Sequence, residues 1–231
     1  MFLGRAVAKI KDYIFPVYCL DCGQEGFWLC ENCYRKLDLS GRFFCPICHQ
    51  TTLDGGCCVD CRLQSELDQE IAILKYSDQG IIGQIIHNLK YNYVEDLQVL
   101  IANLIKDFLR LNPNLFIDVK QIVPVPLHKK RYAERGFNQA EIIAQILSRE
   151  LSIPINKNLQ RKKYTQQQAK LNKEQRKNNI KEAFVFEEYE ITEVILLVDD
   201  VFTTGSTMQA CAKVMKERGV KKVVGFTLAR G

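Results

Sequence analysis

The sequence predicts an α/β fold, in which a mainly parallel sheet is flanked by helices and a small cysteine-rich region precedes it. From about residue 66 onward, apolar runs of strand length alternate with amphipathic helical patterns. Nine of the ten cysteines lie between Cys19 and Cys61. The composition, 47% hydrophobic and 26% charged, is that of a globular protein and excludes a disordered or collagen-like chain. We therefore expect two domains, residues 1–65 and 66–231.

Four apolar runs predict strands, and stripes of apolar residues at helical spacing predict helices between them. The strands are expected at 71–76, 121–126, 194–198 and 223–228, and the helices at 81–89, 97–109, 140–151 and from the turn at 203–207 to about 217. Residues 2–14 predict a further short amphipathic helix, which packs on the protein or binds a membrane surface. Strands alternating with helices imply right-handed βαβ units, whose ligands bind at the carboxyl ends of the strands.

Neither a membrane span nor an export signal is predicted. The longest strongly apolar run, residues 194–198, is far shorter than the ~20 residues that a span needs. Charged residues are scattered through the first sixteen positions, which contain no small-residue cleavage site. Clustered cysteines in a chain without an export signal point to metal binding and not to disulfides.

The clustered cysteines form four pairs, each with two residues between its members. Two thiolates at this spacing can turn inward on one tight knuckle and both reach a metal at ~2.3 Å. A closed four-cysteine site has no open position for substrate, so we expect structural zinc, in two zinc-ribbon sites. Sequential pairing assigns Cys19, Cys22, Cys30 and Cys33 to one ion and Cys45, Cys48, Cys58 and Cys61 to the other. An interleaved pairing stays open, Cys57 could replace Cys58, and His49 is expected beside the metal or exposed.

Positive charge is concentrated in one part of the chain. The formal net charge is +5, and residues 1–65 contribute none of it, with seven basic and seven acidic side chains. Residues 120–181 hold fifteen basic and four acidic residues. This excess suits a partner that carries phosphates, either a nucleotide or a nucleic acid. The alternative is a lysine-rich surface that is simply solvated.

A phosphate-binding loop is predicted after the strand at 194–198. Two adjacent carboxylates, Asp199 and Asp200, follow the strand, and a turn of small residues then opens a helix. Backbone N–H groups of that turn can converge on one phosphate at the positive end of the helix dipole. The carboxylates can accept hydrogen bonds from a ribose diol, directly or through Mg²⁺. The turn consists of Thr203, Thr204, Gly205, Ser206 and Thr207. The alternative is an acidic strand end followed by a capped helix.

A second anion site is predicted in the loop that follows the strand at 121–126. Arg135 offers a planar fork of donors, and Gly136 lets the backbone close on an anion such as pyrophosphate. A polar stretch at 161–179 follows, which forms either a lid over an anionic ligand or an exposed surface helix.

The stretch at 195–207 resembles the signature of the type I phosphoribosyltransferases, which bind phosphoribosyl pyrophosphate (PRPP) with Mg²⁺. That resemblance implies that Asp199 and Asp200 hold the ribose hydroxyls and that residues 203–207 hold the 5′-phosphate. The order of motifs along nearly the whole chain resembles the ComF family. This resemblance rests on the cysteine pairs, the Val-Pro-Val-Pro-Leu run at 123–127, the Arg-Gly-Phe-Asn-Gln run at 135–139 and the loop that contains Asp199 and Asp200. It rests also on Thr165, Gln168, Leu171, Arg176, Asn179 and Phe184.

The resemblance implies a competence protein that handles incoming single-stranded DNA in natural transformation and binds PRPP or a related ribose phosphate. Tyr132, Phe137 and Tyr164 could then stack on bases. Alternatively, the chain is an active Mg²⁺-dependent transferase acting on an unidentified acceptor, with Asp199, Asp200 and Arg135 as catalytic residues. A third interpretation is a zinc scaffold whose transferase domain docks partners. Expected partners are other competence proteins, such as a DNA-translocating helicase, in the cytoplasm or at the inner face of the membrane.

Overall fold

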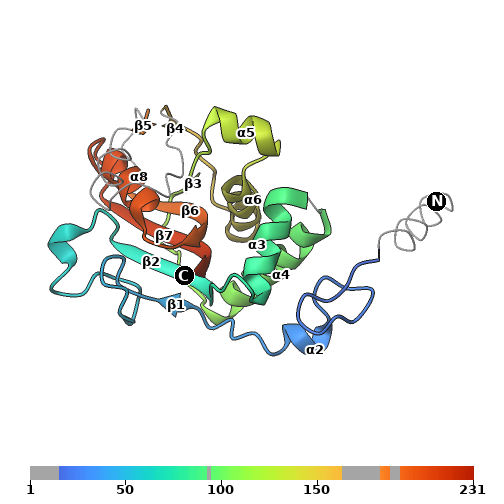
Figure 1. The fold of residues 1–231 in the computed structure, drawn as a ribbon. Coiled ribbons are helices and arrows are strands. Elements are labelled where there is room, and N and C mark those ends of the chain that lie inside the picture. Colours follow the sequence, from blue (N-terminus) through green and yellow to red (C-terminus); the bar gives the residue numbers. More distant parts are fainter. Residues whose placement is uncertain (1–15, 93–94, 163–182, 188–192) are drawn as a thin grey trace.

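The protein contains a five-stranded sheet in the order β1-β2-β7-β6-β3 (Figure 1). The structure, a computed structural model, describes residues 16–92, 95–162, 183–187 and 193–231. The strands are β1 (Arg42–Phe43), β2 (Gln69–Lys75), β3 (Gln121–Pro124), β6 (Val194–Phe202) and β7 (Lys222–Arg230). β2, β7, β6 and β3 run parallel, and β1 is antiparallel to β2. The prediction of a mainly parallel sheet is confirmed.

Helices cover both faces of this sheet. They are α3 (Ile81–Asn92), α4 (Glu95–Leu111), α6 (Gln139–Leu151) and α8 (Ser206–Lys216). The apolar stripes of α3, α4 and α6 pack with Leu196 and Val198 of β6 in one core. Cys211 and Met215 of α8 pack with Leu197 in a second core on the other face. Alternate residues of the buried strand therefore supply the two cores, as the period of two in a strand requires.

β6 is longer than predicted, because the strand continues past Val198 through the acidic doublet. Asp199 pairs with Thr227 of β7, and Phe202 at the end of the strand pairs with Arg230. Backbone pairing with β7 is independent of side-chain charge, so two carboxylates do not end the strand. The loop therefore begins at Thr203 and not at the doublet.

Several short elements were not predicted. They are α2 (Glu31–Tyr34), the 3-10 helix η1 (Arg62–Gln64), α5 (Lys129–Arg135), and a two-stranded sheet of β4 (Leu159–Arg161) and β5 (Phe184–Phe186). The prediction of a loop was wrong at α5, which is stabilised at both ends. His128 Nδ1 accepts a hydrogen bond from Lys130 N at 3.2 Å, and Gly136 N–H donates to Tyr132 O at 2.7 Å.

The cysteine-rich segment contacts the rest of the protein at several places. β1 extends the sheet beside β2, Tyr34 Oη donates to Asp107 Oδ2 of α4 at 2.7 Å, and Gln209 of α8 accepts from Glu66 N at 2.7 Å. The expected helix at 2–14 and most of the polar stretch at 161–179, including Tyr164, lie outside the described residues. Among the helices that the structure describes, none combines the length and apolarity needed to cross a bilayer.

Candidate functional site

The candidate site lies where two neighbouring parallel strands end at the same edge of the sheet. β3 and β6 pair in register, and Val125 N donates to Val198 O at 2.8 Å immediately after β3. The chain leaving β6 turns through residues 203–205 into α8, and the chain leaving β3 leads into α5. The two loops singled out in the sequence therefore start side by side. This is the edge at which parallel sheets bind ligands.

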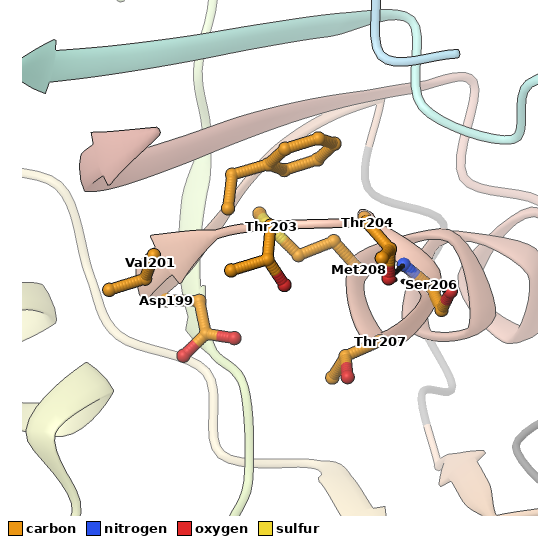
Figure 2. Close-up of a pocket in the computed structure, with 9 residues that line it drawn as sticks. Asp199, Val201, Thr203, Thr204, Ser206, Thr207 and Met208 are labelled. Carbon is orange, nitrogen blue, oxygen red and sulfur yellow. Dashed lines mark hydrogen bonds between the residues drawn. The ribbon is translucent and has the colours of Figure 1, made fainter. Parts of the chain in front are cut away.

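The turn between β6 and α8 encloses a small cavity. Its volume is about 50 Å³, several times the ~10–15 Å³ that one water needs. This is room for a small anion. Figure 2 shows its lining side chains around the end of β6 and the start of α8. The lining consists of Asp199, Val201, Phe202, Thr203, Thr204, Gly205, Ser206, Thr207 and Met208.

Gly205 determines the shape of this turn. It is the N-cap residue of α8 and has a φ of +70°, in the left-handed region that favours glycine. A Cβ at this position would overlap the ring of Phe202, so a larger residue is excluded by space as well as by φ. Glycine offers no side chain to cap the helix, and the first backbone N–H of α8, that of Ser206, donates to Thr204 Oγ1 at 3.5 Å. The hydroxyls of Thr204 and Ser206 lie 2.9 Å apart.

The two carboxylates of the doublet lie on different faces of the sheet. Asp199 is half-buried, lines the cavity, and accepts a hydrogen bond from Asp200 N at 2.9 Å. Asp200 is only 9% exposed and, by the alternation of the strand, is on the face of Leu196 and Val198. The structure thus brings Asp199 together with residues 203–207. Asp200 is not among the residues that line the cavity.

Two groups near the doublet were not predicted. Glu70 of β2 is fully buried, and Thr227 Oγ1 donates to its Oε1 at 3.3 Å. Burial raises the pKa of Glu70 well above its usual value, and the charge of Asp199 acts in the same direction. The pKa of Tyr76 is raised because its hydroxyl donates to Asp78 at 2.7 Å, with burial and the charge of Asp200 contributing. A glutamate at the start of an apolar run was the only sequence signal for Glu70.

Arg135, the predicted pyrophosphate ligand, is the last residue of α5. Its Nη1 donates to Gln139 Oε1 at 3.3 Å. The following loop is held by Asn138, which is buried: its Nδ2 donates to Val125 O at 2.9 Å and its Oδ1 accepts from Ala140 N at 3.1 Å. Asn138 therefore ties the start of α6 to the end of β3. In the sequence, Asn138 stands out as part of the Arg-Gly-Phe-Asn-Gln run at 135–139, and that run does not indicate a link between α6 and β3.

The cysteines form two clusters, and each could hold a metal ion. Within each cluster the four Sγ atoms lie within 4.8 Å of one another. Sγ atoms of Cys22 and Cys30 are 3.6 Å apart, and those of Cys48 and Cys58 are 3.7 Å apart. A tetrahedron with metal–sulfur bonds of about 2.3 Å separates its ligands by about 3.8 Å, so the spacing fits zinc. The sets are Cys19, Cys22, Cys30 and Cys33, and Cys45, Cys48, Cys58 and Cys61.

Hydrogen bonds prepare the first cysteine of each cluster to act as a thiolate. Burial acts to raise the pKa of Cys45, but N–H groups of the knuckle, including Cys48 and Ile47, lower it to about 6. The pKa of Cys19 is also lowered to about 6 by the same balance of effects. Cys57 lies outside the clusters, because its Sγ donates to Leu67 O at 3.5 Å. The sequential arrangement is therefore the one that the fold brings together.

Comparison with known proteins agrees with this geometry. A family model described as "Phosphoribosyl transferase domain" matches residues 133–230. Competence protein F of Haemophilus influenzae is 41% identical over 114 residues, which cover 47% of this chain and 49% of that protein. Competence protein ComFC of Bacillus subtilis is 27% identical over 213 residues, covering 87% and 84%. DNA utilization protein YhgH of Escherichia coli O6:H1 is 30% identical over 152 residues, covering 64% and 67%.

The mainly parallel sheet, the cavity at the start of α8 and the matched domain define the class: this is a protein with a phosphoribosyltransferase domain. The two cysteine clusters precede that domain in the chain. With these relatives across most of its length, the chain belongs to the ComF family.

Proposed function

We propose that this protein acts in natural transformation, where it handles incoming single-stranded DNA, and that it binds PRPP or a related ribose phosphate with Mg²⁺. The observation that carries the ligand proposal is the cavity in which Asp199 meets the turn before α8. The role in transformation is supported by relatives that are named competence proteins.

The turn suits a phosphate. Gly205 has no side chain that could occupy the N-terminus of α8, and the helix dipole favours negative charge there. The hydroxyls of Thr203, Thr204, Ser206 and Thr207 add short polar contacts around the same cavity. In this proposal the phosphate occupies the part of the cavity beside residues 203–207, and the sugar lies on the side of Asp199.

The carboxylates suit the other end of such a ligand. A carboxylate accepts hydrogen bonds from the vicinal hydroxyls of ribose, whereas it repels a second phosphate. In this proposal Asp199 and Asp200 hold the hydroxyls, Mg²⁺ neutralises the pyrophosphate, and Arg135 binds it from the neighbouring loop. Successive side chains of a strand point to opposite faces, so Asp200 lies on the other side of β6 from the cavity. Asp200 could bind a hydroxyl only from that side.

The region that includes α5 suits a nucleic acid. Lys129 and Lys130 are exposed on this helix, and Tyr132 beside them is 46% exposed, although it is a large aromatic residue. Lysines contact the backbone of a single strand, and an exposed aromatic ring stacks on its bases. We assign the zinc sites to structure, because four thiolates leave the metal no position for a substrate.

A second function, catalytic phosphoribosyl transfer to an unidentified acceptor, is favoured by one observation: the matched transferase domain contains both the cavity and Arg135. Asp199, Asp200 and Arg135 would then be the catalytic residues. Leaving pyrophosphate would be stabilised by Mg²⁺ and by Arg135. Release of pyrophosphate from PRPP in the presence of DNA or nucleobases would distinguish this function from binding alone.

Calorimetric titration of the metal-loaded protein with PRPP and Mg²⁺ tests the ligand proposal. We expect binding by the wild type and a loss of at least about tenfold in affinity, or about 1.4 kcal/mol, in Asp199→Ala. Asp118→Ala is the matched control, since Asp118 is an exposed aspartate that does not line the cavity. No binding by the wild type would refute the ribose-phosphate site.

Two further measurements test the role in DNA handling. The affinity for a single-stranded oligonucleotide should fall steeply between low and moderate salt, and should fall further in Lys129→Ala/Lys130→Ala. Affinity that does not change with salt would contradict phosphate contacts. In cells, Asp199→Ala/Asp200→Ala at verified protein level should lower transformation frequency. Unchanged frequency would favour a scaffold whose ligand site is not needed.

A further inference from the structure

Three aromatic rings connect the second cysteine cluster to the phosphate loop. Phe44, which precedes Cys45, lies with its ring centroid 5.3 Å from that of Phe202. His49, which follows Cys48, lies 5.7 Å from Phe202 and 6.2 Å from Phe44. All three pairs meet edge to face. Two residues that flank metal-binding cysteines therefore pack against the last residue of β6.

Phe202 is in turn the support of the loop. It lines the cavity, and its ring occupies the space that a Cβ on Gly205 would need. Its backbone oxygen accepts a hydrogen bond from Gly231 N at 2.9 Å. The loop backbone at Gly205 thus rests directly on a ring that also contacts Phe44 and His49. A displacement of that ring would move the N-terminus of α8 with it.

Arg230 of β7 also contacts the residues that surround the Phe202 ring. It pairs with Phe202 across the two strands, and its Cζ lies 4.3 Å from the centroid of the Phe44 ring. Its Nη2 donates to His49 O at 2.9 Å. The knuckle is therefore attached to the sheet at its backbone as well as through its rings.

The backbone beside the knuckle of Cys45 and Cys48 has an unusual conformation, which a metal would help to hold. His49 has a φ of +66°, which is strained for a residue other than glycine, and its N–H donates to Cys45 O at 3.0 Å. The adjacent Cys48 is exposed, so few packing contacts hold it in place. A metal joining Cys45 and Cys48 to Cys58 and Cys61 would fix the exposed Cys48 and would thereby add to the contacts that hold His49 in this geometry.

From these contacts we infer that the second cluster is a positioning element of the phosphate loop: metal bound by Cys45, Cys48, Cys58 and Cys61 holds Phe202 against Gly205 and so keeps the loop ready for a phosphate. The inference rests on the proposed function where it concerns ligand affinity. The effect on the loop backbone is separate from any ligand. His49, Phe44 and Phe202 act here as positioning residues.

The first cluster provides the comparison. Cys19, Cys30 and Cys33 belong to the core with α3 and α4, and Gln84 of α3 donates to Leu20 O at 3.2 Å. Figure 1 shows α2, which lies between Cys30 and Arg35, at the opposite end of the molecule from α8. Loss of metal from this cluster should leave the phosphate loop unchanged.

Cys48→Ser and Cys22→Ser form a matched pair of variants. Each removes the exposed cysteine that ends the first knuckle of its cluster. Zinc content would be measured for both, together with hydrogen–deuterium exchange of residues 199–210 in the absence of ligand. We expect each variant to lose about one zinc, and only Cys48→Ser to exchange faster at 199–210, by about tenfold. Equal exchange in Cys48→Ser and wild type would overturn the inference.

His49→Asn covers the case in which Cys48→Ser fails to fold. Asparagine tolerates a positive φ and leaves all four thiols in place, but it removes the ring from Phe202. Zinc content should be unchanged, exchange at 199–210 should rise, and affinity for ribose 5-phosphate should fall by about threefold to tenfold. Unchanged exchange in a zinc-loaded His49→Asn variant would contradict the coupling.

Titration of the wild type with ribose 5-phosphate separates the two proposals. If the wild type binds no ribose 5-phosphate or PRPP, the proposed ligand is wrong, while the exchange data still decide whether the cluster positions the loop. If the wild type binds and Cys48→Ser binds equally well with unchanged exchange, the coupling is wrong and the ligand proposal stands.

Discussion

Replacing Glu70 by glutamine should stabilise the protein, and the gain should grow with pH. Glu70 of β2 is fully buried beside β7, and its Oε2 has no hydrogen-bond partner in the part of the chain that the structure describes. Gly225 lies opposite it in the register, and a Cβ there would overlap Oε2. No cation is placed to compensate the charge among the groups that shift its pKa. Burial therefore favours the protonated carboxyl in the folded state and raises its pKa.

The size of the effect follows from proton linkage. In the unfolded chain Glu70 loses its proton near its ordinary pKa of 4.5, whereas the folded protein keeps it to a much higher pH. Between these two pKa values the folded state holds one more proton, so the free energy of unfolding falls as pH rises, by about 1.4 kcal/mol per pH unit. Glutamine has nearly the same shape as glutamate and does not titrate, so the free energy of unfolding of Glu70→Gln does not fall with pH through this residue.

Urea unfolding of wild type and Glu70→Gln at several pH values from 5 to 8, with zinc present, measures the difference. Comparing the two proteins cancels the titration of the cysteines, which they share. Glu193→Gln is the control of opposite sign, because the ion pair with Lys221 lowers the pKa of exposed Glu193 and its removal should cost stability at neutral pH. A difference between wild type and Glu70→Gln that does not change with pH would mean that Glu70 is ionised in the folded protein, and the reasoning would be refuted.

Three further changes have definite expected results. Gly205→Ala should lower the free energy of unfolding, measured in urea, by about 2 kcal/mol or more, because Gly205 has a positive φ and an added Cβ would overlap Phe202. The same change should abolish PRPP binding. An unchanged midpoint of urea unfolding would contradict the strain. Asn138→Ala should cost about 1–3 kcal/mol, because it removes a helix cap and leaves Val125 O without its donor, and Asn138→Asp should restore only the cap. Chelation of zinc should lower the midpoint of thermal unfolding followed by circular dichroism, since the clusters replace a core in the cysteine-rich segment; an unchanged midpoint would argue against structural metal.

The long elements could be predicted because their signals are local. A nine-residue strand such as β6 and a seventeen-residue helix such as α4 contain enough positions to display their period. The strands β1, β4 and β5 have only two or three residues each and cannot. α5 was hidden for another reason: its sequence is polar around the whole helix, and its capping residues determine its ends.

The site was predictable in part for the same reason. The turn at 203–207 follows from adjacent residues in one stretch of sequence, and the two cysteine sets follow from their spacing. Glu70 and His49 could not be predicted, because each reaches the site only through packing of segments distant in the chain. The separation of Asp199 from Asp200 depends on how far β6 extends, and that extent is determined by pairing with β7.

The raised pKa of Glu70 also affects how readily the loop binds an anion. A carboxylate at Asp199 about 4 Å from a phosphate charge costs about 4 kcal/mol at an effective dielectric constant of 20. The helix dipole at the N-terminus of α8 stabilises an anion by at most about 2 kcal/mol, so binding of inorganic phosphate close to Asp199 is unfavourable. A sugar phosphate offsets part of this cost, because its hydroxyls can donate hydrogen bonds to the same carboxylate. A charged Glu70 behind Asp199 would add to the repulsion, and its raised pKa lessens that contribution. The buried carboxyl therefore lowers the stability of the fold as pH rises, and in its protonated form it makes the loop less repulsive to an anion.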